Sequence, residues 1–385
     1  MTQELTQAQP SLEVRVLNGL SDEERAAWRE LASQESISAA FIDEPWASSW
    51  IAAFQPKAPH LLGAWDDGKL VGLAALQRLT EHWSGRRIAV VQSLTNVECT
   101  RFEFLAAPGQ PDVEQRLWET LCDDERCDVI RLDHLPEGSR TLASGLKIAA
   151  QRGWRTHVEQ TFDSPWRALA PPPASWDEGL SRKFKSNLRN RENRLKALGD
   201  VTFEVAMDKD LERAFQIYYE LDSGSWKSRH GTAVFQQANV KTFYERLVAS
   251  APDQIWIPIL SVRGQPAAAH FLLVRGRTMY LQKTAYNLEF APYAPGQLLT
   301  ARLVRYGLAH GMEALDFLAA NMTWKSDWEP RLRPHYRLLL FAPSVSGRYA
   351  YWMRYGLRET AKRVPGLQKL VRAVHLRRAR RGSPA

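Results

Sequence analysis

Cysteine is scarce in this 385-residue chain, and long apolar runs are missing from it. Three cysteines, Cys99, Cys122 and Cys127, are too few for a disulfide framework, and no His accompanies them at metal-ligand spacing. No uncharged stretch approaches the roughly 20 apolar residues of a transmembrane helix, and residues 1–10 lack the apolar core of a signal peptide. We therefore expect reduced thiols, no metal centre and a cytoplasmic protein.

Acidic residues are almost absent from two segments, and these segments hold the whole positive excess of a chain whose net charge is +8. Residues 181–198 carry seven Lys or Arg and one acid, Glu192, while residues 347–385 carry eleven Lys or Arg and one acid, Glu359. A general nucleic-acid-binding protein spreads basic side chains over one face of its fold. The concentration in two places predicts two separate elements that contact anions.

The chain is long enough, at 44% apolar content, to bury two cores. A run of three prolines follows Ala170 and predicts an extended, semi-rigid linker. We therefore expect a first domain over residues 11–169, a second over residues 174–342, and a basic, aromatic tail over residues 343–385.

Two local patterns predict helices in the first domain. Ser21 followed by Glu24 forms a capping-box signature at a helix start. Trp46, Trp50 and Phe54 recur at helical spacing, which is typical of core packing.

The tetrapeptide Ala-Pro-Gly-Gln occurs at residues 107–110 and again at residues 294–297, each time between a strand-like stretch and a helix. The surrounding patterns repeat as well: each half reads as helices, a β-meander, a glycine loop, a helix and a strand. In the second half these expected elements are strands at 255–262, 267–274 and 278–284, a helix at 296–310 and a strand at 314–318. The repetition predicts an α/β fold of two similar units, each a mixed sheet flanked by helices.

The two copies differ in the charge that follows them. Asp112 and Glu114 open the helix after the first copy, whereas no acid follows the second copy until Glu313. Acids stabilise a helix start but repel an anion there. We therefore expect the first domain to be mainly structural and the backbone N–H groups of Gly296, Gln297 and Leu298 to receive a phosphate.

Several short motifs together resemble the GNAT acyltransferases, and the duplication resembles tandem GNAT proteins of the CelD/BcsL type, relatives of the Fem-type aminoacyl transferases. The motifs are Phe41-Ile42-Asp43-Glu44-Pro45-Trp46, the basic segment from Ser181 to Gly199, Ser225-Trp226-Lys227 with Gly231-Thr232-Ala233, and Tyr293-Ala294-Pro295-Gly296 with Asp316-Phe317. The resemblance implies transfer of an acyl group, typically acetyl, from acyl-CoA to an amine or hydroxyl. It also implies an acceptor among sugars and envelope or polysaccharide components, and no metal.

Acyl transfer needs a group that stabilises developing negative charge and a base for the proton of the acceptor. The Fem-type relatives place a lysine for the first role, and Lys325 is the matching candidate here. Asp316, near a strand end, and His270, on an otherwise apolar strand, are the candidates for the base. A buried structural histidine is the alternative interpretation of His270.

Aromatic side chains beside cations indicate acceptor contacts, since a ring face with a nearby cation suits a sugar or an anionic group. Trp226 and Lys227 lie in a loop rich in Gly and Ser, and Trp324 precedes Lys325. On the basic segment, Lys185 and Arg189 are four residues apart and share a helix face. We expect these five side chains to bind substrate.

The tail combines Leu367, Leu370, Val371 and Val374 at helical spacing with many Lys and Arg. This pattern is typical of peripheral contact with an anionic membrane on its inner face. Two alternatives stay open. The protein could transfer an aminoacyl group from charged tRNA, which the basic segment would contact, or it could be an inactive module that binds a membrane-associated polysaccharide synthase. The lone Gly296, where the GNAT pyrophosphate loop carries two glycines, favours the last.

Overall fold

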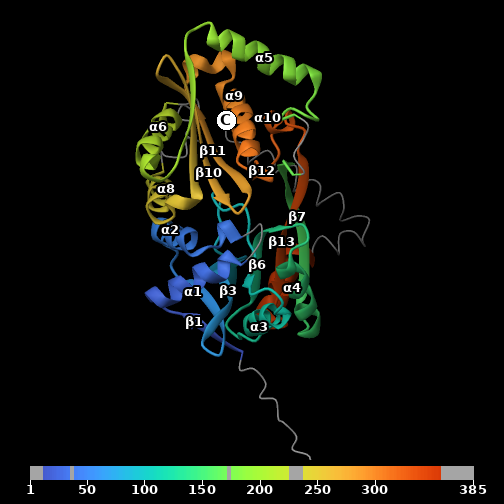
Figure 1. Ribbon diagram of the computed structural model, residues 1–385. Coiled ribbons are helices and arrows are strands. Elements are labelled where there is room, and N and C mark those ends of the chain that lie inside the picture. Colours follow the sequence, from blue (N-terminus) through green and yellow to red (C-terminus); the bar gives the residue numbers. More distant parts are fainter. Residues whose placement is uncertain (1–11, 35–38, 171–174, 225–236, 357–385) are drawn as a thin grey trace, which may run out of the picture.

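A single 13-stranded sheet runs through both halves of the chain in the computed structural model, which describes residues 12–34, 39–170, 175–224 and 237–356 (Figure 1). In sheet order the strands are β1 (Glu13–Leu17), β2 (Pro59–Asp66), β3 (Lys69–Trp83), β4 (Arg86–Ser93), β6 (Val129–Pro136), β13 (Arg331–Phe341), β7 (Arg155–Ala168), β12 (Ala314–Asp316), β11 (Thr278–Tyr286), β10 (Gln265–Arg275), β9 (Ile255–Val262) and β8 (Val201–Ala206), while β5 (Leu105–Ala106) pairs with β3.

The two halves repeat one plan, as the sequence predicted. In the first, the antiparallel β2–β3–β4 meander is followed by α3 (Pro111–Cys122) and by β6, which pairs in parallel with β4. In the second, β9–β10–β11 is followed by α9 (Pro295–Ala309) and by β12, which pairs in parallel with β11. The predicted α/β class with a mixed sheet is confirmed.

The last strand of each half is exchanged with the other half. β7 closes the first half in sequence, but it pairs with β12 of the second half. β13 follows β12 in sequence, but it pairs with β6 of the first half. The two exchanged strands also pair antiparallel with each other along their length. Each half thus completes the sheet of the other.

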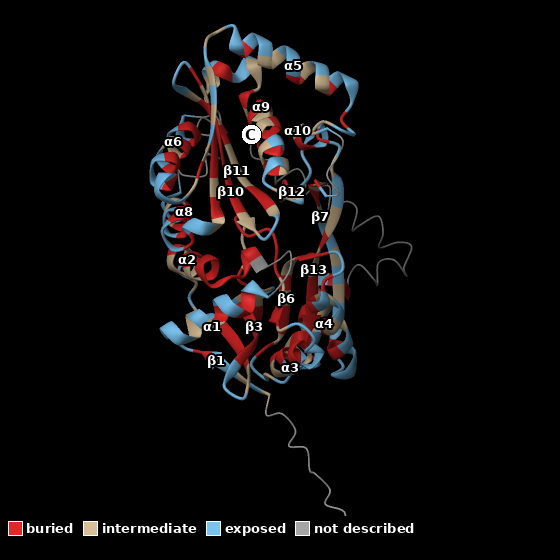
Figure 2. Ribbon diagram, viewed as in Figure 1, coloured by how far each residue is buried: buried red, intermediate tan, exposed pale blue. Residues whose placement is uncertain are grey.

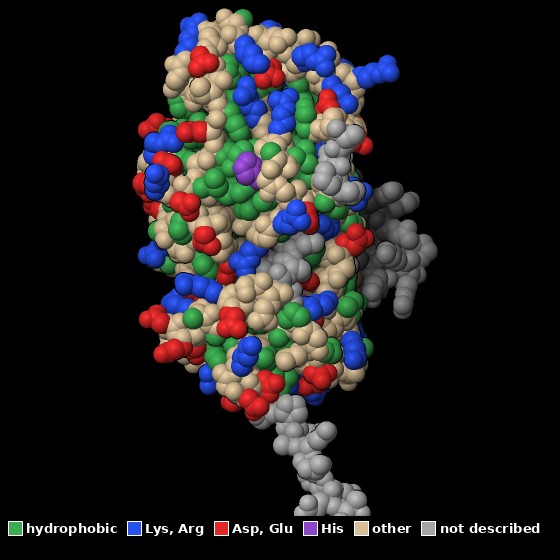
Figure 3. Space-filling view, in the orientation of Figure 1, with side chains coloured by type: hydrophobic (Ala, Val, Ile, Leu, Met, Phe, Trp, Pro, Cys, Tyr) green, Lys and Arg blue, Asp and Glu red, His purple; other side chains and the backbone are tan. Residues whose placement is uncertain are grey.

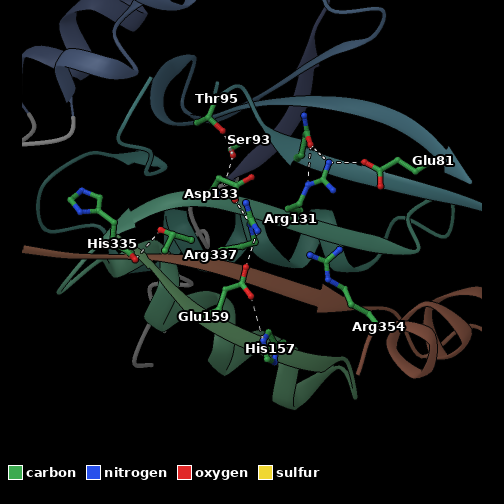
Figure 4. Close-up of polar contacts among 12 residues, drawn as sticks. Glu81, Ser93, Thr95, Arg131, Asp133, His157, Glu159, His335, Arg337 and Arg354 are labelled. Carbon is green, nitrogen blue, oxygen red and sulfur yellow. Dashed lines mark hydrogen bonds and ion pairs between the residues drawn. The ribbon is translucent and has the colours of Figure 1, made fainter. Parts of the chain in front are cut away.

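Ion pairs tie the exchanged strands together on one face of the sheet (Figure 4). Arg337 on β13 donates to Asp133 on β6, and its Nη1 lies 2.7 Å from Oε1 of Glu159 on β7. Farther along the face, Arg131 on β6 donates to Glu81 on β3 over 2.7 Å. These half-buried pairs link strands that lie up to about 200 residues apart in sequence.

Helices cover both faces of the second half of the sheet (Figure 2). The aromatic side chains of α6 (Leu211–Ser223) and α8 (Ala238–Ser250) join Phe271 in one core cluster. α9 and α5 (Arg182–Lys196) pack on the opposite face, in a second cluster that includes Leu272. Among the described residues, the other helices of eight residues or more are α1 (Asp22–Ser33), α2 (Glu44–Phe54) and α4 (Arg140–Gln151).

Local predictions in the first half agree with the structure. Ser21 and Glu24 form the capping box of α1, and Trp46 and Trp50 are buried. The three cysteines are free thiols, and burial raises the pKa of Cys99 to about 12. In the part of the chain that the structure describes, no group of acidic, His and Cys side chains is arranged to hold a metal, and no helix could cross a membrane.

The sequence patterns missed both exchanged strands as well as β1 and β8. The strand expected at 314–318 ends at Asp316, because Leu318 and Ala319 adopt left-handed backbone conformations with φ of 54° and 49°. This sharp turn ends the pairing with β11 and shapes the site described next.

Candidate active site

A cavity of about 550 Å³ opens where β11 and β12 separate. The two strands pair only from Thr278 to Tyr280 on β11, and the rest of the β11 edge lines the cavity. Opposite Phe271, β11 carries one extra residue, Gln282, which bends the strand. Figure 3 shows the hydrophobic hollow on this face, next to the basic side chains over α9 and α5.

The start of α9 forms one wall of the cavity. Pro295, Gly296 and Gln297 line it, and Ala294 precedes them in a left-handed conformation. The backbone N–H groups of Gln297 and Leu298 both donate to the carbonyl oxygen of Ala294. Pro295, the first residue of the helix, has no N–H to donate. Within the described residues, the Gly296 N–H is therefore the backbone donor of this first turn that makes no hydrogen bond.

Gly296 also provides space. A Cβ at this position would meet only Cε1 of His270, at an ordinary contact distance of 3.9 Å. The Gln297 side chain donates to the Trp324 carbonyl and accepts a hydrogen bond from Trp328 Nε1, over 3.0 and 2.6 Å. It therefore connects α9 to the segment that carries Lys325. The Leu298 side chain is buried.

His270 lies on β10 beneath this wall and lines the cavity, although its side chain is fully buried. Its Nε2 is 3.0 Å from Oγ1 of Thr300, and this hydroxyl donates to the carbonyl oxygen of Gly296. Because a hydroxyl has one proton, the hydrogen between Nε2 and Thr300 belongs to the imidazole. The ring thus supports the turn at Gly296.

Lys325 lies on the opposite wall, in the short helix α10 (Thr323–Ser326). Its Nζ donates to the carbonyl oxygens of Leu318 and Ala320, over 2.6 and 3.1 Å. Burial lowers the pKa of this amine to about 8, an effect that the nearby Asp316 carboxylate partly offsets. The ammonium has three protons, so two carbonyl bonds leave one for a ligand in the cavity.

Asp316 does not line the cavity. Its carboxylate accepts hydrogen bonds from Arg101 and from Arg333, and it accepts another from the Leu318 N–H over 2.9 Å. Arg101 is fully buried and comes from the first half of the chain. These contacts of Asp316 fix the turn at Leu318. The carbonyl oxygen of Leu318 in turn accepts a hydrogen bond from Lys325.

The first half also contributes to the cavity itself. Val97 and Thr100 line it, and between them Glu98 makes buried contacts with the second half. Glu98 Oε2 lies 2.9 Å from Nζ of Lys283 on β11, and it accepts a 2.6 Å hydrogen bond from the Tyr244 hydroxyl. The sequence predicted a mainly structural first domain, but this half of the chain also forms one wall of the cavity.

Several predicted substrate residues lie elsewhere. Trp324 lines the cavity beside Lys325, but Lys185 and Arg189 line a separate groove between α5 and α9. Trp226 and Lys227 lie outside the described residues. The structure thus brings together five of the predicted residues around the cavity, which are Lys325, His270, Gly296, Gln297 and Trp324.

Sequence reasoning missed Glu98, Thr100, Arg101, Gln282 and Lys283. One signal was present, because Lys283 interrupts a strand that is otherwise apolar or uncharged from Thr278 to Ala285. Glu98 and Arg101 carried no such signal, since their partners are far away in the sequence.

Residues 182–326 match the family model described as an acetyltransferase (GNAT) domain. The second half has a GNAT fold. None of the curated protein sequences matches the chain. The match places the separated β11 and β12 strands and the α9 start of the cavity within the GNAT domain.

Solved structures with very different sequences share this fold over most of their length. FemX is 10% identical with a TM-score of 0.58, covering 89% of this chain and 99% of FemX. The C-terminal (DUF2156) domain of a proposed lysylphosphatidylglycerol synthetase from Agrobacterium fabrum is 11% identical, with a TM-score of 0.54 and coverage of 87% and 96%. L-PGS from Bacillus licheniformis is 13% identical, with a TM-score of 0.51 and the same coverage. At such identities the likeness concerns the fold alone.

Proposed function

We propose that the protein is an acyltransferase that moves an acyl group, typically acetyl, from acyl-CoA to an amine or hydroxyl. One observation carries the proposal: in a GNAT domain, the cavity between β11 and β12 brings the Gly296 N–H and the Lys325 ammonium to two walls of one apolar space. The first group suits a pyrophosphate, and the second suits a carbonyl oxygen that becomes negatively charged.

The reaction needs few groups. Attack of the acceptor on the thioester carbonyl forms a tetrahedral intermediate, whose oxyanion is stabilised by donors held in position beforehand. For this role we assign the third proton of Lys325 and the edge of β11 beyond Tyr280, which pairs with no other described strand and lines the cavity. Collapse of the intermediate then expels the CoA thiolate, which takes up a proton.

We assign Asp316 to positioning, since its oxygens already bind Arg101, Arg333 and the Leu318 N–H. For the acceptor proton, His270 is the remaining candidate among the residues predicted from the sequence, and it lines the cavity. Its Nε2–H already serves Thr300, so proton transfer would require Nδ1, which lies 3.1 Å from the carbonyl oxygen of Ala269 and would have to leave this contact. Replacing His270 with glutamine tests whether it acts as a base or only supports the turn at Gly296.

The acceptor in this proposal is a sugar or another envelope or polysaccharide component. The support is the resemblance to envelope-modifying GNAT proteins and the position of Trp324, an aromatic side chain at the cavity. We also propose peripheral membrane contact by the tail, whose basic amphipathic part, including Leu367 and Leu370, lies outside the described residues.

An aminoacyl donor is the second candidate. The fold likeness to a proposed lysylphosphatidylglycerol synthetase extends over 96% of that chain, and its name denotes an aminoacyl product. Calorimetric titration of the full chain with acetyl-CoA, free CoA and aminoacyl-tRNA separates the candidates. The proposal requires binding of both CoA species, and heat from aminoacyl-tRNA alone would favour the second candidate.

Replacing Gly296 with glutamate is expected to weaken acetyl-CoA binding by roughly 10-fold or more, because a carboxylate at the α9 start repels a pyrophosphate. Gly296→Ala is the matched control, since its Cβ meets only an ordinary contact with His270. Titration calorimetry gives the dissociation constants, and circular dichroism checks the fold. Equal affinities of the two variants would remove Gly296 from the donor site.

A further inference from the structure

A second hollow, the α5–α9 groove, lies farther along α9, which lines both this groove and the cavity. It has a volume of about 160 Å³ and is lined mainly by Trp176, Lys185, Arg189, Glu192, Arg302 and Arg305. α5 packs on the second half through Phe184, Leu188 and Leu195, which turns Lys185 and Arg189 toward α9. The basic segment found in the sequence thus forms one wall of a shaped site.

The groove has more cations than acids. Arg302 is paired with Glu192 at 3.0 Å, and Lys185 lies 3.9 Å from Asp177, at the limit of an ion pair. Arg189 is exposed and has no acidic partner among residues 12–34, 39–170, 175–224 and 237–356. The groove is lined by four cationic and two acidic side chains. The resulting excess of positive charge fits a ligand with about two negative charges.

An aromatic ring completes the groove. The guanidinium carbon of Arg305 lies 4.1 Å from the ring centroid of Trp176, which is half-buried. Indole rings and guanidinium planes are both surfaces on which nucleobases stack. An aromatic surface beside unneutralised cations is the combination that recognises a phosphorylated nucleoside.

The groove and the cavity share α9. Gly296 lies at the cavity, while Arg302 and Arg305 lie six and nine residues farther along the helix. At a rise of 1.5 Å per residue these positions are about 9 and 14 Å apart from Gly296 along the axis. A donor whose pyrophosphate lies at Gly296 therefore has its ribose phosphate and base within reach of the groove.

We propose that the α5–α9 groove binds the 3′-phosphorylated adenosine of CoA. Arg189 and Arg302 contact the phosphate, and the adenine lies against the Trp176 and Arg305 pair. The position of the acyl end rests on the proposed function, but binding of the nucleotide itself is measurable without any turnover.

The direct test is titration of the full chain with adenosine 3′,5′-bisphosphate. We expect saturable binding to the wild type, a loss of affinity of roughly 10-fold or more in Arg189→Glu, and a comparable loss in Trp176→Ala. Lys183→Glu is the matched control, because Lys183 is exposed on α5 and does not line the groove. This variant should bind the bisphosphate within about twofold of the wild type, apart from general electrostatics.

Three results would overturn the proposal: no binding of the bisphosphate, equal losses in Arg189→Glu and Lys183→Glu, or binding of a short RNA ending in CCA without binding of the bisphosphate. A kinetic comparison separates this inference from the proposed function. If acetyl-CoA and acetyl-pantetheine are both donors, Arg189→Glu should raise the KM for acetyl-CoA alone. If the bisphosphate binds as expected but acetyl-CoA is not a donor, the proposed function fails and the groove assignment stands.

Discussion

Replacing Lys325 with methionine is expected to lower kcat by roughly 100-fold or more, because one donor to the developing oxyanion is lost. Methionine keeps the length and the apolar stem of lysine, so donor affinity should change little. Stopped assays of acyl transfer with saturating acetyl-CoA give kcat, and calorimetry gives the affinity. A variant with more than about a third of wild-type kcat would show that Lys325 is not part of the reaction.

The pH dependence distinguishes two roles for this lysine. Its pKa of about 8 means that the ammonium loses its proton as the pH rises through 8. If the charged form stabilises the oxyanion, wild-type kcat should fall across this range, and the fall should be absent from the residual activity of Lys325→Met. A rise that depends on Lys325 would instead identify the neutral amine as the general base.

The same pKa makes a prediction about stability. In the unfolded chain the amine titrates near its ordinary value of 10.5, and in the folded protein near 8. The unfolded state therefore binds more protons between these values, so this lysine disfavours folding fully below about pH 8 and ceases to do so above about pH 10.5. The difference in unfolding free energy between the wild type and Lys325→Met should change across this window and be flat below it.

Replacing Asp316 with alanine is expected to destabilise the protein by about 3–5 kcal/mol, because removal of one partner leaves a buried charge uncompensated. Arg101, which is fully buried, loses the carboxylate that neutralises it. Urea denaturation at neutral pH measures the loss. A cost below about 1 kcal/mol would mean that water reaches Arg101 after the substitution.

The matched control also removes the positive charge of Arg101. Arg101→Met combined with Asp316→Ala should recover a large part of the lost stability, since apolar residues often replace a buried ion pair at little cost. The double variant should still have reduced kcat, because the Leu318 N–H loses its acceptor and the turn that holds Lys325 is no longer fixed. Recovery of both stability and kcat would contradict the positioning role of Asp316.

Much of the second half could be predicted from its sequence, because its signals are local. The meander and α9 follow from apolar periodicity and from the Gly-containing turn at residues 294–297. These patterns locate His270 on a strand and Gly296 at a helix start, while Trp324 and Lys325 lie in the short helix α10 after β12, and the structure places all four around one cavity.

The pairing of distant segments could not be predicted in this way. β7 carries polar residues on many of its positions, such as Glu159 and Asp163, so its sequence does not resemble a buried strand. Glu98 and Arg101 look like ordinary polar loop residues until Lys283 and Asp316, about 200 positions away, provide their partners. Periodicity describes an element, whereas the identity of its partner depends on the three-dimensional fold.

The exchange of β7 and β13 has a consequence for how the protein is made. β6 ends at Pro136, but its partner β13 is not complete until Phe341 has been synthesised. Ribosomes add about 5–20 residues per second, so the β6 edge waits roughly 10–40 s for its partner. During this interval the nascent chain presents an open strand edge, which is a template for pairing with other chains. Synthesis rate and chaperone supply should therefore affect the yield of this protein.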